Sequence, residues 1–188
     1  MAQSKLTKLS VLRSESAADF AALRERLRKE IKPKGVIEEI YLEDIAHLVW
    51  DIQRLRNFKI STIHQAYGPA LRSLLEQLLF KPVLLEGMDT EVKASVLADG
   101  WLENDAETKK EVRDILRRFD LDESAIEAEA MKLTVDHLQY LDRSLVTASG
   151  RLDKALRLVM EYRSGIAKRL RQQSDQILHE VEPAQQAA

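Results

Sequence analysis

One seven-residue repeat constrains the fold of this chain more than any other feature. Apolar residues recur every seven positions in the last third of the sequence, at Leu138, Leu145, Leu152, Val159 and Ile166. A second set lies three residues after the first four, at Leu141, Ala148, Ala155 and Tyr162. Alternating spacings of three and four place all of these side chains on one stripe of an α-helix, which must be buried against another helix. We therefore predict a long last helix over Ser124–Leu178.

A matching stripe lies in the first third of the chain. Apolar residues alternate spacings of four and three at Tyr41, Ile45, Leu48, Ile52 and Leu55. This pattern predicts a second long helix from Ile37 to His64 or Tyr67, and we expect the two long helices to pair antiparallel because an apolar stripe on a lone helix is not stable in water. The predicted interaction seam consists of Leu138, Leu141, Leu145, Leu152, Val159, Ile166, Ile45, Leu48, Ile52 and Leu55.

Shorter helices account for the rest of the ordered chain. Ser16 is a typical N-cap, and the apolar residues Phe20, Leu23, Leu27 and Ile31 follow it at helical spacing before Pro33 and Gly35. The leucine-rich segment Pro69–Phe80 is apolar around so much of its circumference that we expect it to be largely buried and to cover one end of the helix pair. Two short helices are expected over Gly87–Asp122, with Asp89 and either Asn104 or Asp105 as caps and Gly100 at a helix end.

These elements predict an all-α fold. We expect an elongated helical bundle of five to six helices, built on a long antiparallel coiled-coil-like helix pair. The predicted organisation is a flexible segment over residues 1–15, a single helical domain over 16–178 and a disordered tail over 179–188.

Composition excludes several classes of protein. The 188 residues include 29 Lys and Arg against 31 Asp and Glu, and no Cys. The near-neutral charge argues against a uniformly basic nucleic-acid binder, and the lack of Cys excludes thiolate zinc sites and a cysteine nucleophile. No apolar run approaches the length of about 20 residues that a membrane span needs. We expect a cytoplasmic protein without membrane association.

Residues with the chemistry of a catalytic or metal site do not converge in the sequence. The six Gly residues are scattered, so no phosphate-binding loop is expected, and the four His residues lack metal-ligand spacing. We predict no catalytic residues, no metal and no cofactor. His47, which shares a helix face with Glu43 and Asp51, is the least unsuitable acid–base candidate if the protein were an enzyme.

Positive charge is concentrated on the last helix. A possible polyanion-binding face comprises Arg151, Lys154, Arg157, Arg163, Lys168, Arg169 and Arg171. Such a face would bind the nucleic-acid backbone without sequence preference and with steep salt dependence. From the heptad register we expect Lys154, Arg157, Lys168 and Arg171 to be exposed and Leu152, Val159 and Ile166 to be covered. The acidic segment 101–130 is an alternative partner for these cations.

Three blocks of the sequence resemble a widespread group of uncharacterised bacterial helical proteins. The blocks are the run from Ser16 to Glu38, the segment from Ile45 through Trp50 to Arg56, and the stretch from Leu141 to Leu156. The resemblance implies an all-helical layout and a bacterial cytoplasmic setting, and it implies no activity.

These observations favour a non-enzymatic scaffold or protein-interaction protein that associates with itself through its heptad seams. The expected partner is another protein or a second copy in a homodimer. The alternative is an accessory nucleic-acid-binding protein that uses the basic face of the last helix.

Overall fold

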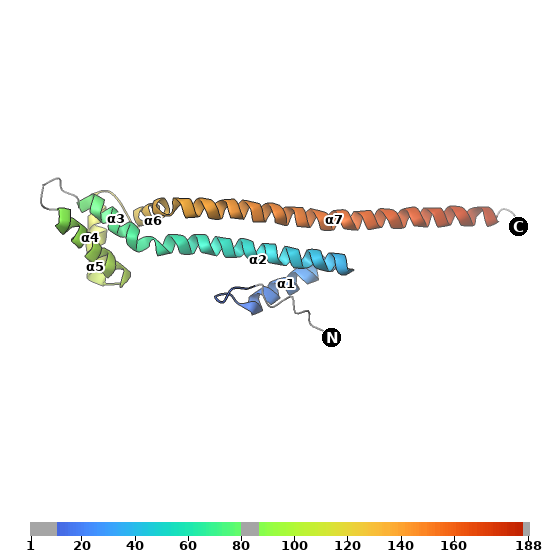
Figure 1. Cartoon of the computed structure of the whole chain (residues 1–188), viewed down its shortest axis with the longest axis horizontal. Coiled ribbons are helices and arrows are strands. Elements are labelled where there is room, and N and C mark those ends of the chain that lie inside the picture. Colours follow the sequence, from blue (N-terminus) through green and yellow to red (C-terminus); the bar gives the residue numbers. More distant parts are fainter. Residues whose placement is uncertain (1–10, 80–86, 186–188) are drawn as a thin grey trace. The chain divides into compact units, whose positions relative to one another are not determined.

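The computed structural model describes residues 11–79 and 87–185, with side chains described over 11–79 and 90–176. Within these ranges the chain forms seven helices and no strand, so the predicted all-α fold is confirmed. The helices are α1 (Ala17–Ile31), α2 (Val36–Gln65), α3 (Tyr67–Leu79), α4 (Gly87–Leu102), α5 (Ala106–Arg118), α6 (Ser124–Leu133) and α7 (Val135–Gln185) (Figure 1).

The contacts of the chain divide it into two compact units. Unit 1 comprises residues 1–53 and 146–188, and unit 2 comprises residues 54–145. The long helices α2 and α7 contribute residues to both units. The single domain expected over residues 16–178 stays a prediction.

Unit 1 begins with α1, whose boundaries follow from local chemistry. The Ser16 side chain accepts a hydrogen bond from the Asp19 N–H at 3.1 Å, as expected for an N-cap. The helix ends where Lys32 adopts a left-handed conformation, with φ of 49°. The apolar face of α1 packs through Phe20, whose ring lies edge-on to Trp50 with centroids 5.4 Å apart.

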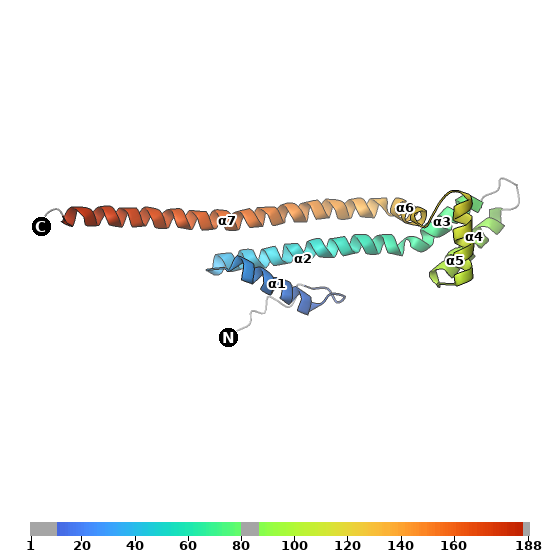
Figure 2. The ribbon, with the colours of Figure 1, turned by 180° about the vertical axis from the view of Figure 1, so that it is seen from behind.

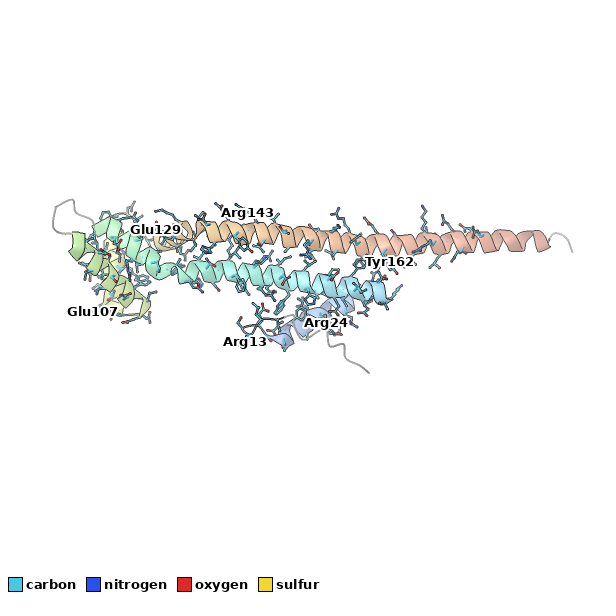
Figure 3. All side chains as sticks on the ribbon, in the orientation of Figure 1. Arg13, Arg24, Glu107, Glu129, Arg143 and Tyr162 are labelled. Carbon is cyan, nitrogen blue, oxygen red and sulfur yellow. The ribbon has the colours of Figure 1, made fainter. Side chains whose placement is uncertain are left out.

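The first part of α2 and the matching part of α7 run antiparallel within unit 1. Ile45 and Leu48 form one buried cluster with Ala155 and Val159. Nearer the start of α2, the ring of Tyr41 lies 6.5 Å from that of Tyr162, measured between centroids. Tyr162 is labelled on α7 in Figure 3. The order of the contacts shows that residue numbers fall along α7 as they rise along α2. Here the two predicted stripes bury one another.

Unit 2 has its own core around α3. Leu71 and Leu75 are fully buried, and α3 packs against α4 and α6. Val112, Ile115 and Leu116 from α5 join the same cluster. The leucine-rich segment is therefore buried as predicted, although Phe80 lies outside the described residues.

The helix ends of unit 2 differ in detail from the sequence analysis. Asp105 caps α5, because its carboxylate accepts the Thr108 N–H at 2.7 Å. Gly100 is not the left-handed residue after α4; Asn104 takes that place, with φ of 66°. A Cβ on Gly100 would lie 2.7 Å from the Thr108 hydroxyl, so glycine is needed here for the close approach of α5. Asp89 lies within α4, which begins at Gly87, and so is not at the N-cap position that the sequence analysis gave it.

The predicted last helix is interrupted. Thr134 separates α6 from α7, and its hydroxyl donates to the Ala130 carbonyl at 2.7 Å. This break explains why seven helices are present in the described ranges where five to six were expected. At the other end, α7 continues to Gln185 and so includes residues 179–185 of the predicted tail. Of the predicted flexible segment, residues 1–10 lie outside the described ranges, and Glu15 accepts a hydrogen bond from the Trp50 indole at 3.0 Å.

Candidate functional site

We call the heptad residues of α7 from position 145 onward the inner seam: Leu145, the last residue of unit 2, and Ala148, Leu152, Ala155, Val159, Tyr162 and Ile166 of unit 1. Ala148, Ala155 and Val159 are buried, and the other four are half-buried. Lys154, Arg157, Lys168 and Arg171 are exposed, so the predicted register of α7 is confirmed. In unit 2, Leu138 and Leu141 are also buried. On α2, Ile45, Leu48 and Ile52 are buried and Leu55 is half-buried.

An ion pair secures the end of the inner seam. The Arg163 guanidinium donates to both Glu38 carboxylate oxygens, at 3.1 and 2.8 Å, and to the Ile31 carbonyl at 2.6 Å. The Lys34 N–H donates to the same carboxylate at 3.0 Å. Hydrogen bonding from Arg163, and then from Lys34, holds the pKa of Glu38 below its ordinary value, and the bond to Glu38 raises the pKa of Arg163. Arg163 therefore joins α1, α2 and α7, whereas the sequence analysis had placed it on a polyanion-binding face.

A groove of about 330 Å³ lies between α2 and α7 in unit 1. Its charged lining consists of Asp44 and Asp51 from α2 and Arg151 and Lys154 from α7. Opposite charges therefore face the same small space, which reduces the positive field of these two cations. His47 also lines the groove, and its ring lies 5.1 Å from that of Phe20.

The remaining cations of the predicted basic face are separated along α7. Arg157 lies one turn after Lys154, and the next members, Lys168 and Arg169, come 11 and 12 residues later, followed by Arg171. All four are exposed. At a rise of about 1.5 Å per residue, the gap between Arg157 and Lys168 is roughly 16 Å. The exposed cations other than Arg163, which is bound to Glu38, therefore form two patches.

A second apolar feature of α7 faces outward. Leu156, Met160, Ala167 and Leu170, which we call the outer stripe, are all exposed, with Met160 at 70%. Leu156, Met160 and Ala167 each follow an inner-seam residue by one position, and Leu170 follows Arg169, the next position of the same repeat. The outer stripe is therefore rotated by about 100° around the helix from the inner seam. Residues 167–176 are exposed at every position, and α7 extends past the first residue of α2 (Figure 2).

Unit 2 contains an open hollow of about 700 Å³ beside α6. Glu129, labelled in Figure 3, lines this hollow and is itself buried. Its carboxylate accepts hydrogen bonds from Ser73 at 3.0 Å and from Lys132 at 3.0 Å. Burial alone would raise the pKa of Glu129, but the hydrogen bonds from Lys132 and Ser73 outweigh it and lower the pKa. The bond from Ser73 ties α6 to α3, and the bond from Lys132 lies within α6, so Glu129 stabilises the packing of unit 2.

Within the described ranges, no three His, Asp or Glu side chains gather closely enough to hold a metal ion. In the same part of the chain, no helix combines the length and the hydropathy that crossing a bilayer requires. His47 lines the groove together with the charged residues Asp44, Asp51, Arg151 and Lys154.

Two charged residues that matter to the fold were missed in the sequence. Glu38 is buried, yet its position three residues before Tyr41 continues the α2 stripe, and this is the signal that would have marked it as core-facing. Glu129 has no comparable signal, because its partner Ser73 lies on another helix, 56 residues away. The residues of the outer stripe are visible in the sequence. They were missed because the regular repeat of the inner seam was sufficient to predict the helix.

Comparisons with known proteins returned no match among family models, curated proteins or solved structures.

Proposed function

We propose that this protein is a non-enzymatic helical interaction protein, which binds a protein partner or a second copy of itself through helix pairing. The observation that carries the proposal is the outer stripe, an exposed row of apolar side chains on α7. Exposed apolar residues gathered along one helix face, here interrupted by Arg163, are typical of interaction sites.

The inner seam is less suited to an outside partner than the sequence suggested. Ala155 and Val159 already pack on Ile45 and Leu48 within the chain. A partner would have to displace α2 and break the pair formed by Glu38 and Arg163. We therefore assign self-association to the outer stripe, which α2 leaves exposed.

The length of α7 supports the same proposal. Residues 167–176 are helical and exposed at every position. A helical segment without tertiary packing is marginally stable in water, because most of the stability of a protein helix comes from packing of one face. Pairing with a second helix would supply that packing.

Light scattering on the full chain at two concentrations tests self-association. We expect the mean mass to rise towards that of a dimer with concentration, and a Met160→Asp substitution to reduce association at least tenfold. Ser164→Asp is the matched control, since Ser164 is exposed on the same helix outside the outer stripe. A wild-type chain that stays monomeric at both concentrations would remove self-association from the proposal.

Sequence-independent nucleic-acid binding is a second candidate, favoured by the exposure of Arg157, Lys168, Arg169 and Arg171. Two observations reduce its support: Arg163 is bound to Glu38, and Arg151 and Lys154 share a groove with acidic residues. Fluorescence anisotropy with duplex DNA at low and moderate salt decides between the candidates. Binding at low salt that an Arg171→Glu substitution weakens would favour this second function.

A further inference from the structure

The outer stripe has a symmetric spacing when it is followed along the whole of α7. The same two heptad positions that hold Leu156, Met160, Ala167 and Leu170 hold Ile177 and Val181 in the sequence. The intervals between these six residues are four, seven, three, seven and four. The order of intervals is the same in both directions, and its midpoint lies between Lys168 and Arg169. All six positions fall within α7, which ends at Gln185.

A palindromic apolar stripe fits a second copy of the same helix running in the opposite direction. In a two-fold symmetric pair, each residue i meets a residue j and j meets i. With the axis between Lys168 and Arg169, position 156 lies opposite 181, position 160 opposite 177, and position 167 opposite 170. Every apolar position of the stripe therefore meets an apolar position.

Charge distinguishes this arrangement from a parallel pair in register, which also matches each apolar position with its own copy. Arg163 lies on the line of the outer stripe, seven residues before Leu170. A parallel pair would place Arg163 against Arg163 of the second copy, so two large guanidinium groups, each bound to Glu38 of its own chain, would face one another on the line of the stripe. The antiparallel pair places Arg163 opposite Ser174 instead.

The net charge of the overlapping segment gives the same preference. Residues 156–168 contain the cations Arg157, Arg163 and Lys168 and the single acid Glu161, a net charge of +2, which becomes +1 when the ion pair of Arg163 with Glu38 is included. Residues 169–181 contain Arg169 and Arg171 against Asp175 and Glu180, a net charge of zero. Antiparallel pairing sets the positive half beside the neutral half, whereas parallel pairing sets two positive halves side by side.

The position of the axis also leaves room for the helices of unit 1. The start of α2 lies beside Arg163, to which Glu38 is bound, and α7 is exposed at every position from 167 to 176. The axis falls just beyond this point. Residue 166 of the second copy would lie opposite residue 171, so the α2 helices of the two copies would lie on either side of the axis.

We infer that α7 forms a two-fold symmetric, antiparallel homodimer through the outer stripe, with the axis between Lys168 and Arg169. This inference rests on the proposed self-association and adds to it the partner, the orientation and the register.

Two aspartate substitutions test the extent of the overlap. Met160 and Val146 occupy the same heptad position and are almost equally exposed, at 70% and 74%. The inferred pairing places no residue of α7 opposite Val146, whereas a parallel pair would place it against its own copy. We expect Met160→Asp to weaken dimerisation at least tenfold in light scattering and Val146→Asp to leave it unchanged. Equal weakening by both substitutions would overturn the inferred register.

Distances between spin labels test the orientation in the full chain. The sequence has no Cys, so a single introduced Cys gives one label per copy. Ser164 and Gly150 lie two heptads apart on the same helix line, and a Cβ on Gly150 would meet nothing within 4 Å. With a rise of about 1.5 Å per residue in each copy, the antiparallel pair separates the labels along the axis by roughly 13 Å at position 164 and roughly 55 Å at position 150.

The two measurements distinguish the inference from the proposal on which it rests. A much longer label distance for Gly150→Cys than for Ser164→Cys supports the antiparallel pair. Equal distances at both positions would show a parallel dimer, which overturns the inference and leaves self-association standing. A wild-type chain that remains monomeric by light scattering removes both.

Discussion

Replacing Ile45 by Ala tests whether unit 1 is held together by the packing of α2 on α7. Ile45 is 1% exposed and belongs to the cluster with Ala155 and Val159. The substitution removes three carbon atoms, which at about 0.8 kcal/mol each is about 2.4 kcal/mol of lost apolar burial. The small Ala155 cannot fill the space, so a cavity cost is added, while the higher helix propensity of Ala returns up to about 0.5 kcal/mol. We expect a loss of about 3 kcal/mol in the free energy of unfolding.

Urea denaturation followed by tryptophan fluorescence measures this loss for unit 1 alone. Trp50 lies in unit 1 and Trp101 in unit 2, so a Trp101→Phe background leaves a reporter only in unit 1. The expected loss corresponds to a drop of roughly 1–3 M in the urea midpoint. Ile40→Ala is the matched control on the same helix, because Ile40 is 53% exposed and should change stability by less than about 0.5 kcal/mol. A loss at Ile40 equal to the loss at Ile45 would refute the packing argument.

Two further predictions concern charge and glycine. The pKa of Glu38 lies below its ordinary value of 4.5 because of its bond to Arg163, so its stabilising contribution is complete above that value and is lost as the pH falls through the lower folded pKa. Glu38→Gln should therefore be less stable than wild type at neutral pH, with a difference that shrinks in acid; a pH-independent difference in thermal melts would argue against the ion pair. Gly100→Ala should destabilise unit 2 by about 1 kcal/mol because its Cβ would meet Thr108, whereas Gly150→Ala should stabilise the chain by about 1 kcal/mol because nothing is near. Stabilisation by both substitutions in urea melts would contradict the close approach of α5.

Local chemistry and periodicity made much of the fold predictable. The Ser16 and Asp105 caps depend on residues three positions apart, and the inner seam depends on a strict repeat, so each could be identified within a short stretch of sequence. The break at Thr134 was missed because Leu138 and the seam that follows it continue a helical pattern without a Gly or Pro to end it. The hydrogen bond from the Thr134 hydroxyl to the Ala130 carbonyl forms both inside helices and at helix ends. A threonine at this position therefore does not predict a break.

The candidate site was less predictable than the fold. A charged residue reads as exposed unless its partner is known, and the partners Glu38 and Arg163 are 125 residues apart. The predicted basic face therefore included Arg163, although its guanidinium serves the packing of three helices. The outer stripe could be proposed as an interaction surface only once α2 was known to pack on the inner seam.

The central claim is that α7 uses one face inside the chain and a neighbouring face outside it. Val159 and Met160 are adjacent in sequence, but Val159 is buried on α2 and Met160 is exposed. The most direct test compares Val159→Asp with Met160→Asp by thermal melting of the helical circular dichroism signal, at a concentration where the wild type is monomeric. We expect Val159→Asp to lower the melting temperature of unit 1 strongly, because a carboxylate would be buried without a partner, and Met160→Asp to leave it within a few degrees of wild type. Equal destabilisation by the two substitutions, or a larger effect at Met160, would contradict the account.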